Sequence, residues 1–254
     1  PCAEGQRAFD PAADRIAGVL TGDVAEQALV AFDPARCGGP AGPVTETIDD
    51  IVIYAVVSDI DGPGRILGRA GPCVTRATSR QTAVGTMQFD AADAQNLIAS
   101  GRFDAVVMHE MLHVIGVGTL WAARNLLQGQ IDQDPRFIGP RATSECMALG
   151  YSSACGVGTV PVENVGGGGT AGVHWRESVF DAELMTGFVE GTPNMPLSTM
   201  TIGSLEDFGY VVYAGAADAF MSPFMARVPP RAGTSDDAFD IVLRPVLEVL
   251  PAGW

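Results

Sequence analysis

The spacing of apolar residues predicts four helices. Residues 8–22 place apolar side chains on one face, as in an amphipathic helix that ends at a glycine. Residues 91–100 follow Asp90, a residue type that favours helix N-termini. A helix that begins near Phe103 is apolar on nearly every side, which predicts a buried position. A last helix is expected over residues 202–208.

Short runs of β-branched residues predict strands between these helices. Residues 51–57 are uniformly apolar and predict a buried strand. Two more strands, residues 65–69 and 84–89, follow the turn sequence DIDGPG at 59–64, and a fourth is expected at 210–213. These strands and helices together predict a small mixed sheet with helices in the first half of the chain, which we interpret as an α+β fold.

The centre of the chain has little periodicity. Residues 117–173 are rich in Gly, Pro, Ser and Asn, and we expect this long segment to be irregular and either functional or held by cross-links. Residues 214–254 are interpreted as a C-terminal extension, which leaves 1–213 as the main domain.

Charge and composition exclude several functions. The chain of 254 residues carries a net charge of -15, which argues against nucleic acid or an anionic membrane as a partner. Its 15 basic residues are all Arg, so Schiff-base chemistry and a Lys-based phosphate loop are excluded. No apolar run is long enough to span a membrane. Because the chain begins at Pro1, we expect a processed or trimmed N-terminus.

Five cysteines occur without a C-x-x-C pair. Spacing favours disulfides between Cys146 and Cys155 and between Cys37 and Cys73, which leaves Cys2 as an odd thiol. Disulfides would indicate export to an oxidising compartment. The alternative is that some of these residues are buried free thiols.

The strongest chemical signal is the sequence HEMLH at residues 109–113. On a helix, His109 and His113 lie on one face one turn apart, where two imidazoles can bind one zinc ion. Glu110 projects beside them and is the candidate general base. The composition gives on the order of 0.002 accidental matches to this pattern, and two His with a Glu are costly to bury on an apolar helix without a function.

A catalytic zinc takes three protein ligands and a water. The compact extended motif would place a third His at position 119, but this residue is Thr119. The remaining histidine of the chain is His174, in the stretch HWRESVFDAELMTG. Met185 in the same stretch is a candidate for a Met-containing turn beneath the metal.

These motifs resemble the leishmanolysin family of zinc metalloendopeptidases, in which an insertion displaces the third His from the helix. The resemblance covers roughly residues 8–213. It implies zinc held by His109, His113 and His174, with Glu110 as general base and Met185 in the Met-turn. It also implies a metzincin-like zincin fold, with a mixed twisted sheet and active-site helix in an N-terminal subdomain (about 1–117) and an irregular C-terminal subdomain (about 118–213).

In such folds an edge strand borders the cleft and pairs with an extended peptide, and residues 84–89 are expected to be that strand. A competing ligand set remains open, in which Glu177 supplies the third ligand, Asp181 supports it and His174 is incidental. Glu177 or Glu183 could also orient a ligand ring.

Acidic turns provide a weaker signal for structural calcium. Asp59 and Asp61 resemble the start of a calcium loop, as do Asp132 and Asp134, but neither pair is followed by the full ligand series. Turn formation explains these residues equally well.

The sequence therefore predicts a secreted or cell-surface, monomeric zinc endopeptidase that acts on protein or peptide substrates. The alternative is a zinc-stabilised adhesion or binding module without turnover. A carbohydrate-binding domain is a third hypothesis, which the few Trp and Tyr residues disfavour.

Overall fold

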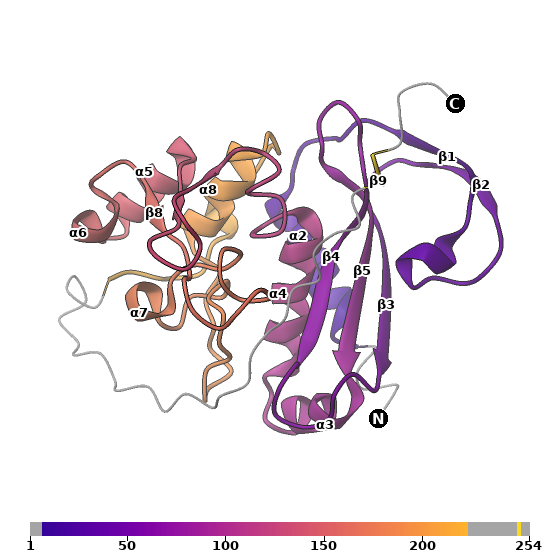
Figure 1. Ribbon diagram of the computed structural model, residues 1–254, viewed down its shortest axis with the longest axis horizontal. Coiled ribbons are helices and arrows are strands. Elements are labelled where there is room, and N and C mark those ends of the chain that lie inside the picture. Colours follow the sequence, from indigo (N-terminus) through magenta and orange to yellow (C-terminus); the bar gives the residue numbers. More distant parts are fainter. Residues whose placement is uncertain (1–6, 223–247, 250–254) are drawn as a thin grey trace.

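The computed structural model describes residues 7–222 and 248–249. Figure 1 shows two halves side by side, with a sheet in the earlier part of the chain, short helices in the later part, and α4 between them. The helices are α2 (Phe9–Val19), η1 (Pro34–Cys37), α3 (Ala91–Ala99), α4 (Phe103–Ile115), α5 (Pro140–Ala148), α6 (Ser152–Cys155), α7 (Glu177–Phe180), α8 (Thr199–Asp207) and η2 (Ala214–Ala216). The strands are β1 (Gln27–Phe32), β2 (Val44–Ile48), β3 (Val52–Ser58), β4 (Gly68–Thr75), β5 (Thr82–Asp90), β6 (Leu127–Gln128), β7 (Arg136–Phe137), β8 (Val160–Pro161) and β9 (Glu248–Val249).

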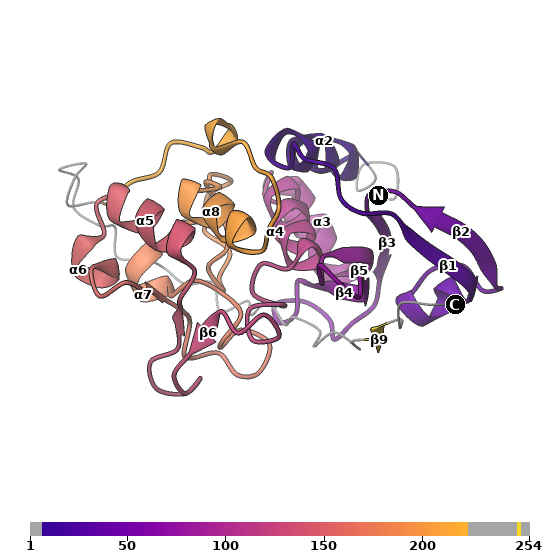
Figure 2. The same cartoon turned by 90° about the horizontal axis from the view of Figure 1, so that it is seen from above.

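The main sheet is mixed and has the order β3-β5-β4-β9. β3 is parallel to β5, β4 is antiparallel to β5, and β9 adds two residues in parallel to the far end of β4. The α+β, metzincin-like fold class is therefore confirmed. Seen from above in Figure 2, helices α2, α3 and α4 lie on one side of this sheet.

Two strand predictions are wrong. Residues 84–89 belong to β5, which lies between β3 and β4 and is therefore not an edge strand. Residues 51–57 correspond to β3, which is an edge strand with exposed Val56 and Val57 rather than a buried strand. A uniformly apolar run does not distinguish a buried strand from an exposed edge, so the sequence alone could not order these strands.

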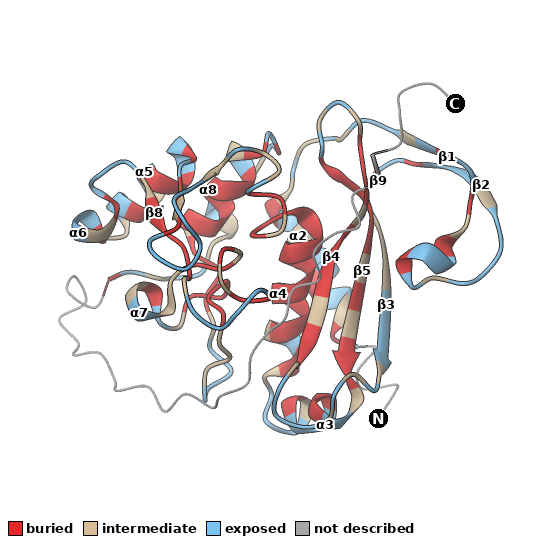
Figure 3. Ribbon diagram, viewed as in Figure 1, coloured by how far each residue is buried: buried red, intermediate tan, exposed pale blue. Residues whose placement is uncertain are grey.

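Helices were predicted more accurately than strands. Asp90 caps α3 by accepting a hydrogen bond from the backbone N–H of Ala92. α4 is buried along almost its whole length, as Figure 3 shows. α8 begins three residues earlier than predicted because the Ser198 side chain caps it at Thr201 N–H.

The segment 117–173 is more ordered than the sequence indicated. It contains α5, α6 and a small three-stranded sheet of β6, β7 and β8. Pro140 at the first turn of α5 is a helix-start signal that the low periodicity obscured. The hairpin of β1 and β2 was also not predicted, whereas the expected strand at 210–213 forms a single bridge between Leu20 and Val212.

Both predicted disulfides are present. Cys37–Cys73 joins η1 to β4, and Cys146–Cys155 joins α5 to α6. Cys2 and most of the predicted extension lie outside the described residues. Within the described part of the chain, no helix is both long and apolar enough to cross a membrane.

Candidate metal centre

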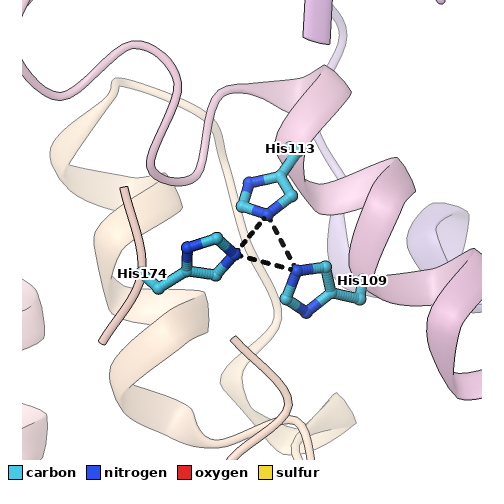
Figure 4. Close-up of side chains that lie close together, drawn as sticks. All are labelled: His109, His113 and His174. Atoms are coloured by element: carbon cyan, nitrogen blue, oxygen red, sulfur yellow. Dashed lines mark hydrogen bonds between the residues drawn. The ribbon is translucent and has the colours of Figure 1, made fainter. Parts of the chain in front are cut away.

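Three buried histidines converge on one point between the two halves of the molecule. The Nε2 atoms of His109 and His113 are 2.8 Å apart, and that of His174 lies 3.2 Å from His109 and 3.0 Å from His113. Figure 4 shows the three rings pointing their Nε2 atoms at one another, two from α4 and one from the loop before α7. The structure thus brings His174 to the two helix histidines, although it lies 61 residues after His113 in the sequence.

The backbone fixes the protonation pattern of each ring. Nδ1 of His109 lies 2.6 Å from the oxygen of Leu184, and Nδ1 of His113 lies 2.9 Å from the oxygen of Val117. Nδ1 of His174 lies 3.0 Å from the carbonyl oxygen of Thr170. A carbonyl only accepts, so each Nδ1 carries a proton, and in the neutral form of each ring Nε2 then directs its lone pair into the centre.

This donor set fits zinc. With Zn–N bonds of about 2.0–2.1 Å and tetrahedral angles, the ligand nitrogens lie about 3.3 Å apart, which is about 0.1–0.5 Å more than the three distances found here. Converging lone pairs repel one another unless a cation lies between them, and backbone carbonyls behind metal-bound His rings are the usual supporting partners. Three neutral imidazoles in one buried cluster can therefore hold a divalent metal ion.

Glu110 is fully buried in α4 beside this cluster. Its carboxylate faces β4 at Gly68, where a Cβ atom would lie 2.8 Å from Glu110 Oε1 and would displace either the carboxylate or the strand. Gly68 thus allows the sheet to approach the carboxylate closely. No pattern in the sequence predicts this contact.

The chain after α4 is shaped to admit His174. Gly116 ends the helix with a φ of 129°, and Gly118 has a φ of 75°. A Cβ on Gly118 would lie 1.8 Å from the oxygen of Val173, so glycine is required for the segment carrying His174 to pass this close. Thr119, which occupies the position of the third His in the compact motif, donates instead to the His113 carbonyl.

A β-turn over residues 183–186 underlies the cluster, closed by a hydrogen bond from Thr186 N–H to Glu183 O. Met185 in this turn is fully buried, and its carbonyl accepts from the N–H of Trp175, the residue after His174. The carbonyl of the preceding residue, Leu184, accepts from His109. The turn therefore contacts both His109 and the residue next to His174.

The rival ligands form a separate cluster. Carboxylate oxygens of Glu177, Asp181 and Glu190 lie within 4.8 Å of one another and are not grouped with the histidines. Burial raises the pKa of Glu177 to about 7, and the neighbouring carboxylates add to this effect. This arrangement favours His174 over Glu177 as the partner of the two helix histidines.

The proposed calcium loops gain no support. Among the described residues, neither acidic pair belongs to a group of three close metal-ligating side chains. Backbone N–H groups of residues 60–62 instead donate to Asp90, and Asp134 forms ion pairs with Arg136 and Arg176. The prediction of calcium therefore stays a prediction.

A small apolar pocket lies beside His109, formed by α4 and the chain after the β-turn. Its apolar lining includes Leu67, Val106, Phe188, Val189 and Met195. A larger cavity, of about 670 Å³, is lined by Met111 and Ile115 on the opposite face of α4. The two cavities thus border different residues of α4.

Comparison with protein families matches residues 37–222 to leishmanolysin, and the match includes α4, the β-turn and all three histidines. No curated protein matches the chain. The match covers well over half of the sequence, and it agrees with the fold and the histidine cluster. The chain therefore belongs to the leishmanolysin family of zinc-dependent metallopeptidases.

Proposed function

We propose that this protein is a secreted zinc endopeptidase in which His109, His113 and His174 bind the metal and Glu110 is the general base. The observation that carries the proposal is the convergence of three Nε2 atoms within 3.2 Å of one another in a buried site. A structural zinc site is normally closed by four protein ligands, whereas a three-ligand site leaves a position for water.

Zinc in this site would polarise both the scissile carbonyl and a water molecule. Glu110 follows the first ligand in α4, so its carboxylate can take the proton of the attacking water and later deliver it to the leaving amine. The Met185 turn supports the site from below by holding His109 through Leu184.

The substrate would bind along β4 rather than β5. Among the described strands, β4 pairs with β5 on one side, and on the other only Val74 and Thr75 pair with β9. The outer edge of β4 near Gly68 is therefore the edge beside Glu110 to which an extended peptide can add as a further strand. The pocket beside His109 would accept an apolar side chain next to the scissile bond.

Two disulfides support export, because such bonds persist in oxidising compartments. The alternative function, an adhesion or binding module without turnover, would not require Glu110. A buried carboxylate beside a metal site is costly unless it has a chemical role, so the peptidase is the better-supported function.

The test is Glu110→Ala, compared with wild type on an unfolded protein substrate. We expect the variant to retain zinc and to lose at least about 100-fold in kcat/KM, since a general base contributes that much or more. Glu206→Ala, at an exposed position of α8, should cleave like wild type. Retained cleavage by Glu110→Ala would contradict the mechanism, and a wild-type protein that binds zinc without cleaving would favour the binding module.

A further inference from the structure

Glu183 is a buried carboxylate that does not point at the histidines. It is 1% exposed and accepts four hydrogen bonds. Oε2 accepts from Met185 N–H at 2.6 Å. Oε1 accepts from the N–H of Ser198 at 3.1 Å and from the hydroxyls of Ser198 and Thr201, each at 2.5 Å. All four partners donate, which suits a carboxylate, because its oxygens accept. Burial raises the pKa of Glu183, and these four hydrogen bonds oppose that rise.

One arm of this network leads to His109. The bond from Met185 N–H to Oε2 fixes the β-turn, and the carbonyl of Leu184 within that turn accepts from His109 Nδ1 at 2.6 Å. The orientation of this carbonyl sets the direction of the imidazole. Glu183 is therefore linked to His109 through a single peptide group, the one between Leu184 and Met185.

The other arm leads to His174. Thr201 donates its hydroxyl proton to Glu183, and its oxygen accepts from Trp175 Nε1 at 2.8 Å. The N–H of Trp175 also donates to the carbonyl of Met185 at 2.9 Å. The residue next to His174 is thus held twice, once by the turn and once by a hydroxyl that Glu183 orients.

We propose that Glu183 is a positioning residue that pre-orients the imidazoles of His109 and His174, on opposite sides of the centre, for binding one metal ion. It acts through the Leu184 carbonyl and through Thr201 and Trp175, without contacting the metal. The proposal rests on the proposed function, since it assumes that these histidines bind zinc. Loss of such supporting groups typically lowers metal affinity about 10- to 100-fold.

Glu183→Gln is the decisive variant. It keeps the side-chain volume but replaces one oxygen with an NH₂ group, which must face a donor at either Met185 or the Ser198–Thr201 side. Asp90→Asn is the matched control. Asp90 is also fully buried and accepts four hydrogen bonds from neutral donors, but these hold the loop at 60–62 and the start of α3.

The experiment measures Zn²⁺ affinity by competition with a chelator, and the visible absorption bands of the Co²⁺-substituted protein. We expect Glu183→Gln to bind zinc about 10- to 100-fold more weakly and to shift the Co²⁺ bands, because the ligand field changes when a ring is misdirected. Asp90→Asn should lose thermal stability while its zinc affinity stays within about twofold of wild type.

Zinc affinity and Co²⁺ bands in Glu183→Gln that match wild type would overturn the proposal, as would an equal loss of affinity in Asp90→Asn. If Glu183→Gln does not fold, Thr201→Val replaces it, since removal of one hydroxyl breaks the arm to Trp175 and should weaken zinc binding in the same direction. Failure of the wild-type protein to bind zinc would instead contradict the proposed function itself.

Discussion

His109 Nδ1 lies 2.6 Å from the carbonyl oxygen of Leu184, 75 residues later in the chain. This hydrogen bond joins the helix that carries the H-E-x-x-H motif to the β-turn that carries Met185. The direction of one ring of the candidate metal centre therefore depends on the fold of the other half of the molecule, and an isolated α4 would not hold the histidine in this orientation.

The identity of the third ligand is tested by replacing each of the two rival residues, His174 and Glu177, with alanine. His174→Ala should lower zinc affinity by several orders of magnitude, because it removes one of three converging nitrogens. Glu177→Ala should bind one equivalent of zinc like wild type, since its carboxylate clusters with Asp181 and Glu190. Zinc content measured after dialysis distinguishes them, and the reverse pattern would establish the Glu177 ligand set.

Gly68→Ala should reduce activity without loss of zinc. Its new Cβ would lie 2.8 Å from Glu110 Oε1, so either the carboxylate or β4 must move, and a displacement of about 1 Å at a reacting group can cost about 100-fold in rate. We expect a fall in kcat of at least about tenfold. Gly18→Ala, in open space on α2, should leave kcat unchanged and stabilise the helix by about 0.5–1 kcal/mol. Unchanged kcat in Gly68→Ala would show that the contact with Glu110 does not matter.

Stability should depend on pH through Glu177. Burial raises its pKa from 4.5 to about 7, so the folded state holds this proton more tightly than the unfolded state. The contribution to stability is complete below about pH 4.5 and is lost as the pH rises through about 7. Glu177→Gln should therefore be more stable than wild type at pH 8, by about 1 kcal/mol after allowance for solvent screening of a partly exposed group, and the difference should shrink at pH 5.

Urea unfolding at the two pH values measures this effect. Glu206→Gln, at an exposed position, serves as control for the removal of one negative charge from a chain of net charge -15. A stability difference for Glu177→Gln that is equal at pH 5 and pH 8 would argue against a buried, protonated Glu177.

The two disulfides should contribute unequally to stability. Cys37–Cys73 spans 36 residues and Cys146–Cys155 spans 9. The chain-entropy estimate then gives about 3.8 kcal/mol for the first and about 2.6 kcal/mol for the second. Replacing each pair with Ser and measuring unfolding should show the larger loss for Cys37 and Cys73, and the opposite order would indicate that native-state effects dominate.

The sequence predicted those features of the fold and of the candidate site that depend on residue type and spacing. The Asp90 cap, the buried helix of His109 and His113, and the cysteine pairs follow from spacing and residue type. The position of β5 inside the sheet could not be predicted in this way, because strand order depends on pairing between segments that are distant in the sequence. The ring supports were also inaccessible, since Leu184 and Val117 contribute backbone carbonyls, which any residue type provides.

The central claim is that one zinc ion binds to His109, His113 and His174. The most direct test is a crystal of the zinc-loaded protein, with anomalous diffraction recorded on both sides of the zinc absorption edge. We predict a single strong peak about 2.0–2.1 Å from all three Nε2 atoms. A peak at Glu177, Asp181 and Glu190, or none at the histidines, would contradict the account.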